Sequence, residues 1–209
     1  MITLEKTLVC GWEPAIRGMR NPLNSWHLID STFDGEVKIG ENDHNLMMKL
    51  AKSGSSHAKY RRYIVVTVDI TAPLYWWKEF DTYKVGTVAN SCSTMHKIHA
   101  KEFVLEDLSV DSLIGDNGHP LPICNYILEE LNYSRERFLE TNDKKYWRRM
   151  IQLLPSSYNQ KRTVQLNYEV LAGIYPDRKH HKLDEWHKLC DWIESLPYSE
   201  LITVGKEQK

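Results

Sequence analysis

The strongest constraint on the fold is a short run near the middle of the chain, YIVVTVDI, at residues 63–70. β-Branched residues dominate this run, and they favour extended strands. Val65 and Val66 interrupt the alternation of apolar and polar side chains, which predicts a strand that is buried on both faces. A strand of this kind places a small sheet, rather than a bundle of helices alone, at the centre of the fold.

An aromatic helix is predicted directly after this strand. Thr71 is a suitable cap and Pro73 suits a first turn, so they predict where the helix begins. Trp76 and Phe80 follow at helical spacing on one face, and Gly86 is expected to end the helix.

The remaining segments complete an α+β pattern. Residues 7–12 predict a short strand, and residues 14–28, which contain Pro14, Gly18 and Pro22, predict a loop. Residues 162–178 begin as a strand and continue as a helix. Helical periodicity is found at residues 40–54, 121–142, 143–155 and 182–196. We therefore expect one α+β domain over residues 1–209, with a small, mainly antiparallel sheet and several helices.

In two of these helices the sequence makes specific predictions. Asn42 or Asp43 is expected to cap the helix at residues 40–54. In the helix at residues 121–142 the inward face is expected to carry Ile123, Ile127, Leu128 and Leu131.

Charge and cysteine content narrow the class of partner. The net charge is -1, with basic residues spread along the chain, which argues against nucleic acid held by bulk charge and leaves a small anion as a ligand. The four cysteines form no C-x-x-C pair, which predicts reduced thiols in the cytoplasm. The first residues do not have the pattern of a signal peptide, and no apolar run is long enough for a membrane span, so no membrane partner is expected.

A run of small polar residues follows the aromatic helix, and such residues rarely build a core. The run consists of Thr87, Ala89, Asn90, Ser91, Cys92, Ser93 and Thr94. Cys92 could serve as a nucleophile, but no paired base is evident in the sequence, which favours a packing role. His96 and His99 lie near one helical face without a third ligand nearby, so no metal site is predicted.

The order of the elements resembles the flavin-dependent thymidylate synthase family. The signature of that family is Arg-His-Arg-x-x-Ser-x-Asn-Glu-x-Ser-x-Arg, and it follows a strand and a helix. Set under the signature without a gap, the stretch TYKVGTVANSCST has a different residue at every fixed position. In signature order these residues are Thr82, Tyr83, Lys84, Thr87, Ala89, Asn90, Cys92 and Thr94.

The second half of the chain is similar to the family in spacing. Leu154-Pro155 follow a helix, and Asn167 and Arg178 come after them at the family's distances. Gly173-Ile174 stand where the family has His-Phe. The family's flavin-facing His has no clear counterpart, since Tyr60 or Arg62 falls at that place. The resemblance covers about residues 40–195.

The resemblance implies a fold like that of the family and a cytoplasmic enzyme that transfers a one-carbon unit to dUMP. FAD would be the cofactor, and methylene-tetrahydrofolate and NADPH would be co-substrates. Arg178 would hold the base as the catalytic residue, whereas Thr82, Tyr83, Lys84 and Asn167 would hold the cofactor. The nucleotide would contact Thr87, Asn90, Cys92, Thr94 and Arg178. A homotetramer is expected, both from the family and from the surplus of Trp and Tyr on the helices.

Two alternatives to the enzyme hypothesis remain open. The loss of the signature residues favours a protein that binds a nucleotide, or a signal derived from one, without chemistry. A structural protein with a vestigial pocket is the third. If the nucleotide is retained, Arg61, Arg62 or Arg162 would have to replace the missing Arg cations.

Overall fold

The computed structural model describes residues 2–205, and within them the chain is α+β. Four strands form one antiparallel sheet in the order β1-β2-β4-β3, which confirms the predicted fold class. The strands are β1 (Thr3–Cys10), β2 (Val65–Pro73), β3 (Val88–Ser91) and β4 (Asn159–Asn167). Most of the β-branched run at residues 63–70 thus lies in β2, which is inside the sheet between β1 and β4.

Eight helices accompany the sheet in the described part of the chain. They are α1 (Trp12–Arg20), α2 (Glu41–Lys52), α3 (Leu74–Phe80), α4 (Pro122–Thr141), α5 (Lys144–Leu153), α6 (Tyr168–Arg178), α7 (Asp184–Glu194) and α8 (Glu200–Thr203). Four 3-10 turns, η1 (Asn21–Leu23), η2 (Trp26–Leu28), η3 (Lys59–Arg62) and η4 (Leu105–Asp107), lie in the connections. None of the helices within residues 2–205 has the length and hydropathy needed to cross a membrane.

These elements are divided between two compact units. Unit 1 contains residues 2–3, 70–82 and 90–162, and unit 2 contains residues 4–69, 83–89 and 163–205. The chain passes from one unit to the other within β2 and close to the middle of β4. The expectation of a single domain over residues 1–209 therefore stays a prediction.

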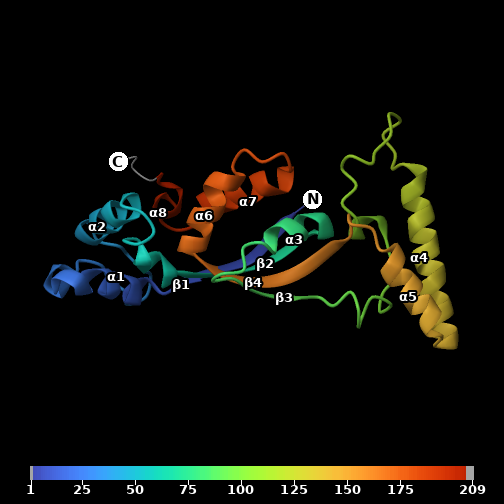
Figure 1. Cartoon of the computed structure of the whole chain (residues 1–209), viewed down its shortest axis with the longest axis horizontal. Helices are drawn as coiled ribbons and strands as arrows, with labels where there is room; N and C mark the ends of the chain where they lie inside the picture. Colours follow the sequence, from blue (N-terminus) through green and yellow to red (C-terminus); the bar gives the residue numbers. More distant parts are fainter. Residues whose placement is uncertain (1, 206–209) are drawn as a thin grey trace. The chain divides into compact units, whose positions relative to one another are not determined.

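The helical hairpin of α4 and α5 contributes to a hydrophobic cluster in unit 1. The two helices lie side by side (Figure 1) and bury Leu131 and Met150 together with Ile98 and Phe103. Ile127 and Leu128 are partly buried against this cluster, as their spacing predicts. Ile123 is 54% exposed, so its predicted inward position is wrong. It lies in the first turn of α4, where the helix has not yet reached the buried cluster.

The predicted burial of β2 on both faces is only partly right. Val66, Val68 and Ile70 are fully buried, but the residues between them are only half-buried, so burial alternates along the strand. The helix after β2 also begins later and ends earlier than predicted. Thr71 belongs to the strand, Pro73 is the N-cap residue of α3, and the helix ends before Gly86. These differences arise because strand pairing holds residues that are also suited to a helix start.

Residues 12–20 form α1, although the sequence predicted a loop there. Pro14 lies in the first turn, where its missing N–H costs no helical hydrogen bond. Trp12, Ala15 and Ile16 are buried on one face of the helix. Gly11 precedes α1 with a φ of 91°, a left-handed conformation, and its backbone lies so close to Tyr63 that a Cβ would stand 1.9 Å from the Tyr63 carbonyl oxygen.

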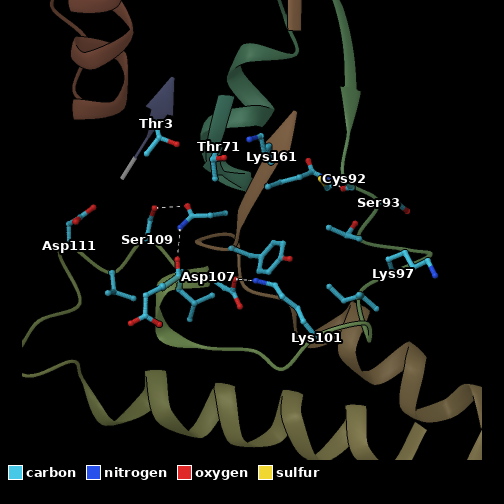
Figure 2. Close-up of a pocket in the computed structure, with 18 residues that line it drawn as sticks. Thr3, Thr71, Cys92, Ser93, Lys97, Lys101, Asp107, Ser109, Asp111 and Lys161 are labelled. Carbon is cyan, nitrogen blue, oxygen red and sulfur yellow. Dashed lines mark hydrogen bonds and ion pairs between the residues drawn. The ribbon is translucent and has the colours of Figure 1, made fainter. Parts of the chain in front are cut away.

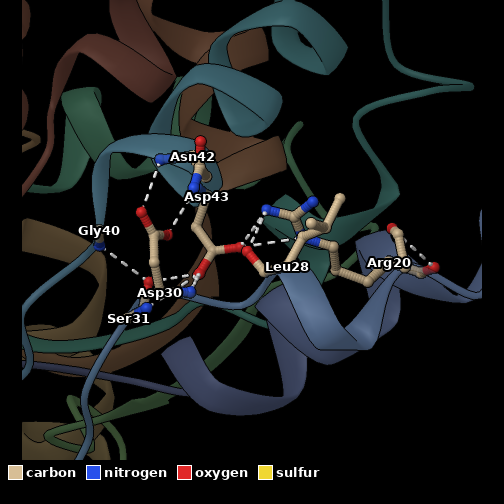
Figure 3. A network of polar contacts seen from close by, with 8 residues as sticks. Arg20, Leu28, Asp30, Ser31, Gly40, Asn42 and Asp43 are labelled. Atoms are coloured by element: carbon tan, nitrogen blue, oxygen red, sulfur yellow. Dashed lines mark hydrogen bonds and ion pairs between the residues drawn. The ribbon is translucent and has the colours of Figure 1, made fainter.

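A buried charge pair connects α1 to α2 in unit 2 (Figure 3). The Arg20 guanidinium donates to Asp43 Oδ1 from Nε at 3.0 Å and from Nη2 at 2.7 Å. Asp43 Oδ2 accepts hydrogen bonds from the backbone N–H groups of Asp30 and Ser31, both at 3.1 Å, and from the Ser31 hydroxyl at 2.7 Å. Both oxygens of this fully buried carboxylate are therefore satisfied.

This network also corrects the predicted cap of α2. Gly40 is the N-cap residue and has no side chain to offer, so neither Asn42 nor Asp43 caps the helix. Asp30 replaces them, because its carboxylate accepts hydrogen bonds from Asn42 N–H at 2.8 Å and from Asp43 N–H at 3.0 Å. The cap therefore comes from a preceding loop rather than from the helix sequence.

Candidate functional site

Unit 1 contains a cavity of about 810 Å³, which we call the unit 1 cavity (Figure 2). Three stretches of the chain provide most of its lining: the segment that follows β3, the turn around η4, and the start of β4. The volume lies within the range of pockets that enclose small organic ligands.

The segment after β3 is fixed to β4 by hydrogen bonds. Cys92 N–H donates to the Lys161 carbonyl at 2.9 Å, and the Gln160 side-chain amide donates to the Cys92 carbonyl at 2.8 Å. Gln160 is itself buried, and its oxygen accepts a hydrogen bond from Arg162 Nε at 3.0 Å. Backbone and amide contacts thus hold Cys92 at the cavity while its short side chain leaves room for a ligand.

The opposite wall comes from the segment around Ser109. Ser109 N–H donates to the Ser157 carbonyl at 2.8 Å, and the Ser109 hydroxyl donates to Asn159 Oδ1 at 2.8 Å. Leu108 and Tyr158 form an antiparallel bridge. Burial raises the pKa of the Tyr158 phenol, so it remains a neutral donor at physiological pH.

Both signs of charge line the cavity. The cations are Lys97, Lys101 and Lys161, and the acids are Glu106, Asp107 and Asp111. Lys101 and Asp107 form an ion pair, and this hydrogen bond raises the pKa of the Lys101 ammonium. With small hydroxyl groups beside the lysines, this lining suits an anion that also carries hydrogen-bonding groups.

Of the nine residues predicted for the site, only Cys92 and Thr94 line this cavity. Asn90 is exposed on β3, as are the other three residues of that strand. Thr82 is exposed, and its hydroxyl donates to the Glu79 carbonyl at 2.7 Å at the end of α3. Their predicted contacts to nucleotide or cofactor stay predictions.

A second group of predicted residues meets in unit 2 around Arg178. Arg178 Nε donates to the Tyr83 hydroxyl at 2.8 Å, and the guanidinium lies 4.3 Å from the centroid of the Trp186 ring. Trp186 is fully buried, whereas Arg178 and Tyr83 are half-buried. We call Arg178, Tyr83 and Trp186 the Arg178 stack. Its cation–π contact helps to orient the guanidinium.

The turn that follows Tyr83 packs against the start of α6. Asn167 caps this helix, since its side-chain oxygen accepts hydrogen bonds from Glu169 N–H and Val170 N–H, both at 3.1 Å. Gly86 has a φ of 78°, and a Cβ there would stand 3.1 Å from the Asn167 side-chain nitrogen. Lys84 is exposed, and the Thr87 hydroxyl oxygen is buried without a hydrogen-bond partner. An unpaired buried hydroxyl is costly unless a ligand or water meets it.

The other candidate cations differ in their surroundings. Arg162 pairs with Asp81 at 2.7 Å and lies 4.1 Å from the centroid of the Trp77 ring, so it is already engaged in unit 1. Arg61 is buried in unit 2, with Nη1 3.6 Å from Glu169 Oε2. Arg62 is exposed. Arg162 is therefore hydrogen-bonded to a carboxylate, whereas Arg61 only lies near one, and its Nε and Nη2 are buried without hydrogen-bond partners among the described residues.

No group of three or more His, Cys, Asp or Glu side chains suited to a metal ion occurs within residues 2–205. His96 is exposed, whereas His99 is half-buried and its ring packs edge-on against Phe138, with centroids 4.9 Å apart. The two imidazoles thus stand in different surroundings despite their helical spacing in the sequence.

Most of the residues that line the cavity were not predicted from the sequence. Lys97, Lys101, Asp107, Ser109 and Gln160 come from segments that are distant in sequence and match no local motif. The one signal in the sequence was the run of small polar residues, of which Cys92, Ser93 and Thr94 line the cavity.

Comparisons with known proteins agree on the fold. No family model matches the chain, and no curated protein matches it. Among solved structures, thymidylate synthase X (ThyX) from Helicobacter pylori with FAD and dUMP has a TM-score of 0.71 and 16% identity, covering 96% of each chain. Another ThyX complex from Helicobacter pylori with FAD and dUMP gives 0.69 and 16%, covering 96% of this chain and 95% of that one.

A third solved structure is the UMP/dUMP methylase PolB from Streptomyces cacaoi bound with 5-Br dUMP. It has a TM-score of 0.62 and 14% identity, and the match covers 97% of this chain and 93% of that one. Together these likenesses show that the chain has a ThyX-like fold, as the resemblance implied. At such low identity they show the fold alone.

Proposed function

We propose that the chain binds a pyrimidine nucleoside monophosphate in the unit 1 cavity. The observation that carries this proposal is the cavity itself, where Lys97 and Lys101 lie among the side chains of Cys92, Ser93 and Thr94. A phosphate monoester is a dianion with several acceptor oxygens, so ammonium and hydroxyl donors are its natural partners. The solved neighbours that carry dUMP or 5-Br dUMP on this fold support a pyrimidine as the base.

Flavin-dependent one-carbon transfer is the second candidate function. The ThyX structures with bound FAD support it, and the PolB structure supports methylation of the base. In unit 2 the unpartnered Thr87 hydroxyl and the exposed Lys84 ammonium fit the phosphate groups of such a cofactor. Tyr83 and Asn167 would contact it nearby, and Thr82 is the remaining predicted contact.

FAD, when bound and reduced, would supply a hydride, and the chain's own residues would orient the reactants. Methylene-tetrahydrofolate and NADPH belong to this hypothesis as co-substrates. The tetramer and the cytoplasmic location that the resemblance implies also stay predictions.

Titration of the pure protein separates the two functions. We expect calorimetry to show binding of dUMP or UMP, and Lys97→Ala to weaken it about tenfold through loss of one charged hydrogen bond. Lys78→Ala is the matched control, because Lys78 is an exposed lysine on α3 that does not line the cavity. A yellow preparation, or one that becomes yellow with FAD, would support the flavin-dependent enzyme in addition to nucleotide binding. A colourless preparation that binds nucleotide would support the nucleotide-binding protein without flavin chemistry.

Absence of nucleotide binding, or equal affinity loss in Lys97→Ala and Lys78→Ala, would contradict the proposed function. Absence of binding would exclude nucleotides as the ligand. Equal affinity loss in the two variants would show that the nucleotide does not bind in the cavity.

Cys92→Ser is expected to retain nucleotide affinity within about threefold. Cys92 is held by backbone contacts, and serine keeps a short side chain with a hydrogen-bonding group. Calorimetry with dUMP and UMP measures this, and a thermal melt checks the fold. Complete loss of a measurable methylation activity in a folded variant would instead identify the thiol as an essential nucleophile.

A further inference from the structure

The ion pair between Lys101 and Asp107 lies at the unit 1 cavity, where both side chains contribute to the lining (Figure 2). Its two members are held very differently. The Lys101 side chain is 67% exposed, whereas that of Asp107 is only 13% exposed. The lysine is therefore the member that can change position at low cost.

Asp107 has a second anchor that does not depend on the lysine. Its Oδ2 accepts a hydrogen bond from Val104 N–H at 3.1 Å, and its own N–H donates to the Val104 carbonyl at 3.0 Å. These two bonds close the turn at η4. If Lys101 left, Asp107 would keep its backbone hydrogen bond at Oδ2, whereas Oδ1 would lose the donor that Lys101 provides.

Lys101 also carries the chemistry that an incoming phosphate needs. Its ammonium has three donors on a flexible stem, and it can exchange one anionic acceptor for another without changing its charge. Lys97 lines the same cavity, so two ammonium groups are available there to a dianionic ligand.

We propose that Lys101 leaves Asp107 when the nucleotide binds and donates instead to its phosphate, so that Asp107 competes with the ligand for this cation. This inference rests on the proposed function, and it makes Lys101 a selector for phosphorylated ligands over neutral nucleosides. Asp107 is then the residue that limits affinity, because each binding event must break its ion pair with Lys101.

The chain contains a matched pair outside the cavity. Asp143 caps α5 by accepting a hydrogen bond from Lys145 N–H at 2.9 Å, and Lys145 Nζ lies 3.2 Å from Asp143 Oδ2. An aspartate that closes a turn thus pairs with an exposed lysine there too, in the same unit, but neither residue lines the cavity.

Calorimetric titration with UMP, dUMP, uridine and deoxyuridine tests the exchange. Asp107→Asn keeps an oxygen for Val104 N–H but removes the competing charge, so the affinity for the nucleotides should rise about threefold to tenfold. Lys101→Met should lower it about tenfold. Neither change should alter the much weaker binding of the nucleosides. Asp143→Asn and Lys145→Met should leave every affinity as in the wild type.

The outcomes are distinguishable. Unchanged or weaker nucleotide binding in a folded Asp107→Asn variant would overturn the exchange while leaving the proposed function intact. Absence of nucleotide binding in the wild type would contradict both the exchange and the proposed function. Should Asp107→Asn fail to fold, Lys101→Met still decides, because a side chain so exposed tolerates replacement. An equal loss for nucleotide and nucleoside in that variant would also overturn the exchange.

Discussion

Replacement of Asp43 by alanine is expected to lower the free energy of unfolding by about 3–5 kcal/mol, the usual effect of removing one partner of a buried ion pair. The pair is well shielded, since the side chains of Arg20 and Asp43 are 5% and 0% exposed. The variant would leave the Arg20 guanidinium buried with only the Leu28 carbonyl, at 3.2 Å, among its hydrogen-bond acceptors in the network of Figure 3. Ser31 and Asp30 would lose the acceptor of their N–H groups as well.

Chemical denaturation of the two proteins at the same pH measures this effect. Asp34→Ala is the matched control, since Asp34 is an exposed aspartate on the same connection between α1 and α2. Its replacement should change the stability by no more than about 0.5 kcal/mol. Similar midpoints for the two variants would show that the buried pair makes no net contribution to the free energy of unfolding.

The second large effect is expected at Arg178. Arg178→Lys should cost about 1.5–3 kcal/mol of affinity for a ligand bound in unit 2, such as the proposed flavin cofactor, while the fold stays intact, since this is the value of a hydrogen bond to a charged group. The guanidinium is held by Tyr83 and Trp186, so its orientation is fixed before any ligand arrives. Lysine has neither the planar fork nor the delocalised face that this stack uses.

Titration of wild type and variant with dUMP, other nucleotides and FAD tests this prediction. Lys179→Ala provides the comparison, because Lys179 follows directly and pairs with Glu194 at 3.1 Å. An Arg178 side chain that only stabilises the end of α6 would be worth about 0.3–1 kcal/mol of folding stability. Unchanged affinity for every ligand, with a small drop in melting temperature, would therefore make Arg178 structural.

The local sequence pattern was sufficient to predict a helix or strand where the residues of that element alone determine its conformation. The β-branched run became β2, and the periodic segments became α4, α5 and α7 close to their predicted limits. A change from strand to helix within residues 162–178 was also predicted, and the structure places it at Asn167, whose side chain caps α6. Residue order and spacing also led to the ThyX-like fold, although every fixed residue of the signature is different.

Predictions from the local sequence pattern were wrong where contacts with distant residues determine the conformation. Pro14 and Gly18 suggested a loop, yet burial of Trp12 and Ile16 made that segment α1. The cap of α2 was assigned to Asn42 or Asp43, whereas Asp30 provides it from the preceding loop. Local propensities are worth less than the burial of a large side chain or the pairing of a carboxylate, so tertiary contacts override them.

Local patterns along the chain were sufficient to predict the α+β class, the central strand and most helices. The set of residues that line the unit 1 cavity could not be predicted in this way, because they come from segments that meet when the chain folds. Folding also brings Lys101 and Asp107 together as an ion pair at the cavity, and it brings Arg178 into contact with Tyr83 and Trp186. Hydrogen bonds and ring contacts depend on distances of a few ångströms, and spacing along the sequence fixes such distances only within a single helix or strand.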